Sequence, residues 1–273
     1  MEDYVYIAKF ADIQCAHSGS SDAMRTIIDC FKIEPNVREM VSAVGGGGKT
    51  TTIFKLAAKL KQLNKKVLIT TTTAIYNPEK ELYDNIVVLD REETIEKNWE
   101  NGSITVLGRT ISEENKLLGV NKEFIDNIYS RGLFDFILVE ADGSKRKPIK
   151  APDSHEPVIP SLTTKTIGVI GMDSIGKTID EATVHRPLIF SKVTNSKIGG
   201  IITEDTVVRL ILSKEGLFKG TPVDSERYLL LNKADSELQI RQANEIAEKL
   251  KGIQLQLNGI IAGSMKHERI RCI

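Results

Sequence analysis

Apolar positions along the chain alternate between two kinds of spacing. Short aliphatic runs, typical of buried parallel strands, are separated by segments in which apolar residues recur every three or four positions, as on the inner face of a helix. The expected strands are 39–44, 67–70, 86–89, 104–107, 136–140, 166–170, 228–231 and 259–262. The expected helices are 23–32, 49–62, 92–100, 122–130, 205–212 and 236–250. This alternation predicts an α/β fold, a doubly wound and mostly parallel sheet with helices on both faces.

Two segments interrupt this pattern. Residues 1–35 have little periodicity before their single helix, and we expect an N-terminal extension there. Residues 36–273 are then expected to form one domain. Four prolines fall within 146–160 and exclude a helix, so a long functional loop is expected near 145–162.

Charge and composition exclude several partners. Lys and Arg number 37, as do Asp and Glu, so no net field attracts nucleic acid or an anionic membrane. No apolar run reaches the roughly 18 residues that cross a bilayer. The three cysteines and four histidines are scattered, without the close spacing of a disulfide framework or metal cage. We therefore expect a cytoplasmic protein that has neither nucleic acid nor membrane as a partner.

The strongest chemical signal is a phosphate-binding loop with the sequence AVGGGGKTT over residues 43–51, between an expected strand and an expected helix. Glycines let consecutive backbone N–H groups turn toward phosphate, and the helix N-terminus adds partial positive charge. Lys49 is expected to reach the β- and γ-phosphates, and Thr50 to bind Mg²⁺. A glycine-rich hairpin would need neither the Lys-Thr ending nor these flanking elements. The expected nucleotide-binding residues here are Gly45, Gly46, Gly47, Gly48, Lys49, Thr50 and Thr51.

An acidic strand end supplies the second part of the expected magnesium site. The strand 136–140 ends at Glu140, and Asp142 and Gly143 follow with the acid-x-x-Gly spacing of GTPase switches. Either Glu140 or Asp142 would hold Mg²⁺ with Thr50, and Asp142 could instead orient the attacking nucleophile. The candidate catalytic residues are therefore Lys49, Glu140 and Asp142.

A third motif concerns the base. Asn232, Lys233 and Asp235 form N-K-x-D at the end of the strand 228–231. A carboxylate at Asp235 can accept hydrogen bonds from both N1–H and the 2-amino group of guanine, whereas adenine offers an acceptor at N1 and no such amine. Asn232 would brace the loop or meet the N7/O6 edge, and Lys233 would cover the ring. GTP is therefore favoured over ATP.

Basic residues follow the acidic motif. Lys145 and Arg146, with His155 and Arg186 further along, could bind an anionic substrate or stabilise a transferred phosphate. A solvated run of charges accounts for them equally well.

With these residues placed, the chain resembles the YqeC family, described as selenium-dependent hydroxylase accessory or selenium cofactor biosynthesis proteins. The resemblance covers about residues 36–265. It is carried by VGGGGKTT from Val44, VLITTTT from Val67, LVEADGS from Leu138, HEPVIP from His155, VHRP from Val184 and LNKAD from Leu231. It implies a P-loop NTPase, of the kind that includes metallochaperone GTPases for nickel enzymes, associated with the maturation of selenium-dependent molybdenum hydroxylases.

Three functions remain open from the sequence. One is a slow, Mg²⁺-dependent GTPase or ATPase that acts on a selenium-dependent molybdenum hydroxylase or its maturation proteins. Another is a small-molecule kinase or ATP-using transferase, and the third is a nucleotide-gated binding protein without catalysis. By analogy with related GTPases, a homodimer across the nucleotide face is expected.

Overall fold

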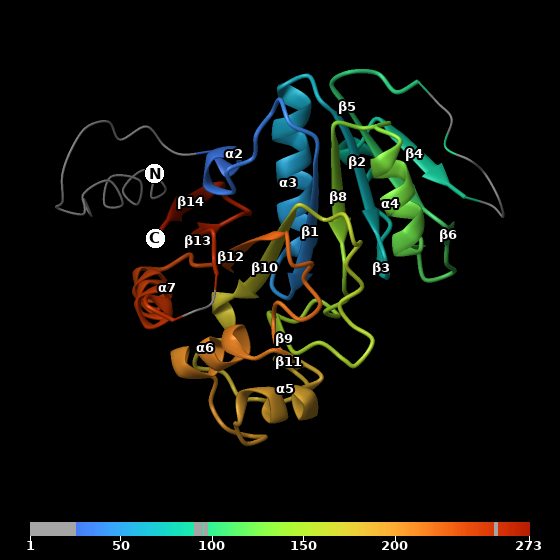
Figure 1. The fold of residues 1–273 in the computed structure, drawn as a ribbon. Helices are drawn as coiled ribbons and strands as arrows, with labels where there is room; N and C mark the ends of the chain where they lie inside the picture. The colour runs from blue at the N-terminus through green and yellow to red at the C-terminus, as the bar shows by residue number, and fades with distance from the viewer. Residues whose placement is uncertain (1–25, 90–94, 96–97, 254–255) are drawn as a thin grey trace, which may run out of the picture.

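A central β-sheet organises the computed structural model, which describes residues 26–89, 95, 98–253 and 256–273 (Figure 1). Within these residues the sheet has nine strands in the order β14-β13-β12-β10-β1-β8-β2-β5-β4, and only β14 runs antiparallel to its neighbour. The strands are β1 (Glu39–Gly45), β2 (Lys66–Thr71), β4 (Asn85–Val88), β5 (Ser103–Gly108), β8 (Phe136–Glu140), β10 (Lys165–Gly171), β12 (Glu226–Asn232), β13 (Gly259–Ser264) and β14 (Arg269–Cys272). The predicted mostly parallel α/β sheet is confirmed.

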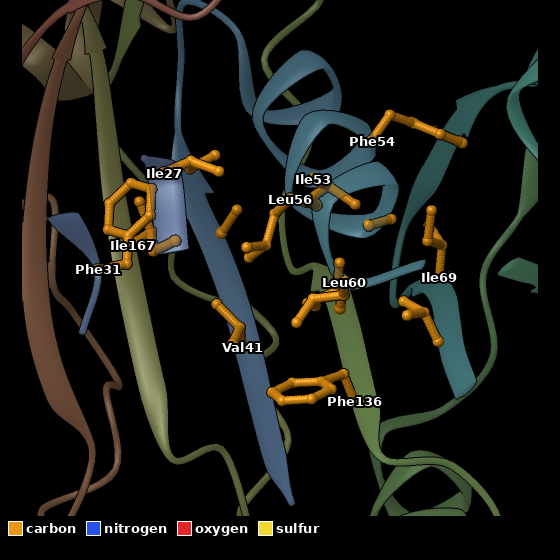
Figure 2. Close-up of a cluster of buried hydrophobic side chains, with 14 of the residues drawn as sticks. Ile27, Phe31, Val41, Ile53, Phe54, Leu56, Leu60, Ile69, Phe136 and Ile167 are labelled. Carbon is orange, nitrogen blue, oxygen red and sulfur yellow. The ribbon is translucent and has the colours of Figure 1, made fainter. Parts of the chain in front are cut away.

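One face of the sheet is covered by α3 (Lys49–Gln62) and the short α2 (Ile27–Cys30). Side chains alternate across each strand, so Val41, Ile69 and Phe136 point to this face (Figure 2). Leu56 and Leu60 on α3 are fully buried in the same cluster. Burying one such side chain contributes roughly 1.5–3 kcal/mol, which fixes α3 against β2, β8 and β1.

The opposite face carries α4 (Lys122–Ser130), α6 (Glu204–Leu212) and α7 (Glu237–Leu250). Ile125 of α4 packs with Met40 and Val139, while Ile246 of α7 packs with Leu231. The β-strands are therefore apolar on both faces, as the continuous aliphatic runs predict.

The strand order positions the candidate site. β1 lies between β8 and β10, and Ala43 pairs in register with Glu140. Because parallel strands present their carboxyl ends at one edge, the glycine loop after β1 meets the acidic end of β8 there. The segments β9 (Ile149–Lys150) and β11 (Val184–His185) form a small parallel pair, and in Figure 1 they lie with α5 (Pro187–Thr194) below the lower ends of the central strands.

Two predicted helices differ from the structure. The helix predicted over 23–32 is helical only over Ile27–Cys30 in the described residues, because Thr26 caps its start and Lys32 adopts φ 47° at its end. Most of the helix predicted over 92–100 lies outside the described residues, and its last three positions, 98–100, are not helical.

Several short elements were not predicted. A three-stranded antiparallel sheet joins β3 (Ala74–Tyr76), β7 (Lys116–Leu118) and β6 (Thr110–Ile111), and α5, β9, β11 and β14 are also additions. The proline-rich loop near 145–162 has no helix, as predicted, but its middle is packed into the protein: Ile149, Lys150 and Ala151 are buried. In the described part of the chain, every helix is too short or too polar to cross a membrane.

Candidate functional site

The glycine loop has a backbone conformation that only glycine adopts readily. Gly45, Gly47 and Gly48 have φ of 94°, 87° and 128°. A Cβ on Gly47 would lie 2.3 Å from the backbone nitrogen of Gly171, and one on Gly48 would lie 2.3 Å from Asn232 Nδ2. The loop is therefore built tightly against β10 and the end of β12.

Backbone N–H groups in the loop divide into two sets. The first three bind protein acceptors: Gly45 to Asp142 Oδ2 at 3.0 Å, Gly46 to the Val169 carbonyl at 2.9 Å and Gly47 to the Lys147 carbonyl at 3.1 Å. The N–H groups of Gly48, Lys49 and Thr50 have no acceptor among the described residues, because the first turn of a helix has no intrahelical partners. The donors free for an anion thus lie at the N-terminus of α3, and not along the whole glycine run as the sequence suggests.

Lys49 lies beside both candidate acids. Its Nζ is 3.1 Å from Asp142 Oδ1 and 3.7 Å from Glu140 Oε1, and it donates to the Gly45 carbonyl at 2.6 Å. Burial lowers the pKa of Lys49, but the carboxylates of Asp142 and Glu140 outweigh burial, so this pKa is raised. Lys49 is therefore a charged group held next to the free N–H donors.

Thr50 and Glu140 form the part of the site that suits a magnesium ion. Thr50 Oγ1 donates to Glu140 Oε2 at 2.7 Å. Burial is the largest influence on Glu140 and raises its pKa, against the opposing effects of Lys49 and the Thr50 hydrogen bond. No group of three or more His, Cys, Asp or Glu side chains in the described residues could hold a metal by itself. Mg²⁺ bound to phosphates needs only one or two protein oxygens, so this pair fits it.

A buried lysine that the sequence motifs did not single out connects the acids to the proline-rich loop. Lys150 is 1% exposed, and its Nζ lies 3.1 Å from Asp142 Oδ2 and 2.6 Å from Glu156 Oε2. It also donates to the Gly143 carbonyl at 2.7 Å. The apolar neighbours of Lys150 in the sequence are the one signal of its burial.

Glu156 is the centre of this network. Arg186 forms a two-pronged ion pair with it, through Nη1 to Oε2 and through Nη2 to Oε1 at 3.1 Å. Burial raises the pKa of Glu156, but the hydrogen bonds and charges of Arg186 and Lys150 outweigh burial and hold this pKa at about 2. Next to Arg186, burial lowers the pKa of His185 to about 4, helped by the charges of Arg186 and Lys150. His185 is therefore neutral near pH 7.

The N-K-x-D motif begins at the glycine loop and ends at the surface. Asn232 Nδ2 donates to the Gly47 carbonyl at 2.8 Å, and Asn232 Oδ1 accepts from the Met265 N–H at 2.9 Å. Lys233 Nζ pairs with Asp173 Oδ2 at 2.9 Å. The side chain of Asp235 is exposed, just before α7 begins.

These groups surround a cavity of about 1000 Å³. Glu140 lines it, whereas Asp142 does not and is 1% exposed. The other predicted residues that line it are Gly47, Gly48, Lys49, Thr50, Thr51, Lys145, Arg146, Arg186 and Lys233. Gly45, Gly46, Asn232, Asp235 and the exposed His155 are not part of its wall.

Comparison with known proteins places this site in a family. The sequence profile of the YqeC protein family matches residues 41–188, more than half of the chain. The YqeC protein of Escherichia coli (strain K12) is 33% identical over 199 residues, which are 71% of this chain and 75% of that protein.

The chain belongs to the YqeC family.

The family match divides the YqeC site into two parts. The matched residues, 41–188, include the glycine loop, Glu140 and the Lys150 network. They do not include the N-K-x-D residues at 232–235. The glycine loop and the acidic and basic residues beside it thus lie inside the family's matched region, and the N-K-x-D motif lies outside it.

Proposed function

We propose that this chain binds Mg²⁺ and a purine nucleoside triphosphate in the cavity at the N-terminus of α3 and hydrolyses the nucleotide slowly. The observation that carries the proposal is the convergence of the free N–H groups at the start of α3, the ammonium of Lys49 and the Thr50–Glu140 pair. Helix N-termini favour anions, and a lysine beside one adds a full positive charge. The deep anchoring of the glycine loop against β10 and β12 keeps these donors in place.

Each residue has a distinct role in this proposal. Lys49 and the N–H donors hold phosphate oxygens, and Thr50 with Glu140 holds Mg²⁺, which neutralises phosphate charge when bound. Glu140 is the better candidate ligand of the two acids, because it lines the cavity. Asp142 accepts from the Gly45 N–H and contacts Lys49 and Lys150, so we assign it the positioning of the loop and of Lys49.

Guanine is the favoured base. Lys233 lines the cavity, and the exposed Asp235 lies two residues further on, with no hydrogen-bond partner for its carboxylate among the described residues. Such a carboxylate can accept from N1–H and the 2-amino group of guanine, and it would meet only the N1 acceptor of adenine. Asn232 supports this assignment because it ties the motif to the glycine loop.

The physiological role we propose is an accessory step in selenium cofactor insertion into molybdenum hydroxylases. This role is supported by the resemblance to the YqeC family, which is described as a family of selenium-dependent hydroxylase accessory proteins. The client would be a selenium-dependent molybdenum hydroxylase or one of its maturation proteins, which would bind one nucleotide state in preference to the other.

Phosphate release tests the proposed reaction. With Mg²⁺ present, we expect slow release of phosphate from GTP, and slower release from ATP. Thr50→Val should reduce the rate at least tenfold while leaving the fold intact, because it removes the hydroxyl and keeps the shape. In competition experiments Asp235→Ala should remove the preference for GTP and keep binding to the phosphates. Equal or faster turnover of ATP by the unaltered protein would contradict the guanine assignment, and no release with either nucleotide would contradict hydrolysis.

A further inference from the structure

The cavity continues beyond the phosphate site. Past the N-terminus of α3, its wall includes Tyr76 of β3 and the segment Lys145–Lys147, which we call the basic strap. The proposed Mg²⁺–nucleotide complex needs the α3 end and the Thr50–Glu140 pair, and it leaves this part of the cavity without an assigned ligand.

Charge in this part of the cavity is not balanced. Seven Lys or Arg residues line the cavity, against three Glu. Four of the seven have carboxylate partners: Lys49 with Glu140 and Asp142, Lys116 with Glu114, Arg186 with Glu156, and Lys233 with Asp173. Within the described residues, no carboxylate pairs with the three members of the basic strap. Unpaired cations that share a concave site raise the local concentration of anions.

The backbone of the basic strap is strained and anchored. Lys145 and Arg146 adopt φ of 47° and 61°, in the left-handed region that side chains with a Cβ rarely occupy. Lys147 anchors the C-terminal end of the strap through two contacts: its carbonyl accepts from the Gly47 N–H, and its Nζ donates to the Ala182 carbonyl at 2.9 Å. Strained residues beside a functional site persist where the surrounding structure imposes them. Both strained residues line the cavity.

Arg146 is oriented by an aromatic ring. Its guanidinium carbon lies 3.9 Å from the ring centre of Tyr76, which is 51% exposed. A guanidinium stacked on a ring keeps the N–H groups at its edge available to donate in pairs to phosphate or carboxylate oxygens. No hydrogen bond from Arg146 to a described residue uses those donors.

We propose that Lys145 and Arg146, with Tyr76 behind the guanidinium, form a subsite for a second, anionic small molecule that carries a phosphate or carboxylate group. This molecule binds in the same cavity as the nucleotide and next to its phosphates. The position of the subsite relative to the nucleotide rests on the proposed function. The Lys147 carbonyl of the strap accepts a hydrogen bond from the Gly47 N–H, and this bond connects a ligand in the subsite to the glycine loop.

Calorimetry on the full chain tests this subsite. In the first titration, a non-hydrolysable GTP analogue with Mg²⁺ reports the nucleotide site. In the second, the nucleotide-saturated protein is titrated with inorganic phosphate in one arm and malonate in the other. We expect one saturable equivalent of anion, and the arm that binds more tightly identifies the ligand group. Arg146→Gln and Lys145→Gly should each weaken anion binding about tenfold, the value of one charged hydrogen bond, and change nucleotide affinity less than threefold.

A control variant and a stability measurement separate a binding role from a structural one. Lys214→Gln, an exposed lysine without an ion pair among the described residues, should leave both affinities unchanged. Lys145→Gly removes the charge together with the left-handed strain, so its thermal midpoint should stay equal or rise while anion binding falls. A fall in the midpoint with unchanged anion binding would assign Lys145 a structural role and overturn its part in the subsite.

Other outcomes are equally decisive. Absence of saturable binding in both anion arms overturns the subsite. Displacement of the anion by the nucleotide, with equal losses of both affinities in the Arg146→Gln variant, would mean that the basic strap serves the triphosphate alone. If the first titration shows no nucleotide binding, the proposed function fails, and the anion titration of the nucleotide-free protein with its variants then decides the subsite independently.

Discussion

Replacing Lys150 with methionine should destabilise the protein by about 3 kcal/mol. The ammonium contacts two carboxylates, 2.6 Å from Glu156 Oε2 and 3.1 Å from Asp142 Oδ2, in a position that is 1% exposed. Removing one partner of a buried ion pair costs about 3–5 kcal/mol, since the other charge stays buried. We expect the lower end, because Glu156 keeps Arg186 and Asp142 keeps Lys49.

Urea unfolding at pH 7 measures this cost. The midpoint should fall with an unchanged slope, and the exposed control Lys214→Met should stay within about 0.5 kcal/mol of the unaltered protein. The pKa of Glu156 is about 2 in the folded protein, against 4.5 as its ordinary value. A depressed carboxyl pKa stabilises the fold above about pH 4.5, and this contribution is lost as the pH falls toward 2. The difference between Lys150→Met and the unaltered protein should therefore shrink as the pH falls from 7 to 3.

Either of two results would refute this reasoning. A cost below about 1 kcal/mol at pH 7 would mean that the two carboxylates do not depend on the lysine. A difference that stays constant from pH 7 to pH 3 would mean that Lys150 acts through packing of its aliphatic chain and not through its charge.

Three further changes test other parts of the site. Gly47→Ala should weaken nucleotide binding more than tenfold in calorimetry. The control Gly176→Ala also places alanine at a positive φ, of 80°, but it has open space for a Cβ, so backbone strain is the only effect that we expect from it. His185→Gln should make the loss of stability between pH 6.5 and about 4 smaller, because unfolding there adds a proton that the folded histidine does not bind. Asn232→Ala should lower the free energy of unfolding by about 1–3 kcal/mol, since it leaves buried backbone groups unpaired.

Much of the fold could be predicted because its sheet is buried on both faces. Strands of that kind are aliphatic throughout, and the helices between them carry their apolar residues at helical spacing. The helices 49–62 and 122–130 have the predicted bounds, as does the strand 136–140. Elements of two or three residues, such as β6 and β9, are too short to have a period, and their pairing depends on residues far away in the sequence.

The candidate site was predictable where its chemistry is local. The glycine loop and the acid that ends β8 can be identified from a few adjacent residues, but the position of Lys150 depends on how the proline-rich region folds back, so that Lys150 contacts Asp142, Glu156 and the Gly143 carbonyl. A lysine among prolines suggests a solvated loop, and only its apolar neighbours indicate burial. Helix α5 did have a local signal, because Pro187 occupies the first helical turn, where proline is favoured.

The most direct test of the account is a calorimetric titration with a non-hydrolysable GTP analogue and Mg²⁺, comparing the unaltered protein with Lys49→Met. The account predicts one saturable equivalent of nucleotide, dependence on Mg²⁺, and a loss of affinity of at least about tenfold when the charge of Lys49 is removed. Circular dichroism of the variant would confirm that it is folded. Absence of nucleotide binding by the unaltered protein, or binding of equal strength in the folded Lys49→Met variant, would contradict the central claim that the glycine loop and α3 form a nucleoside triphosphate site.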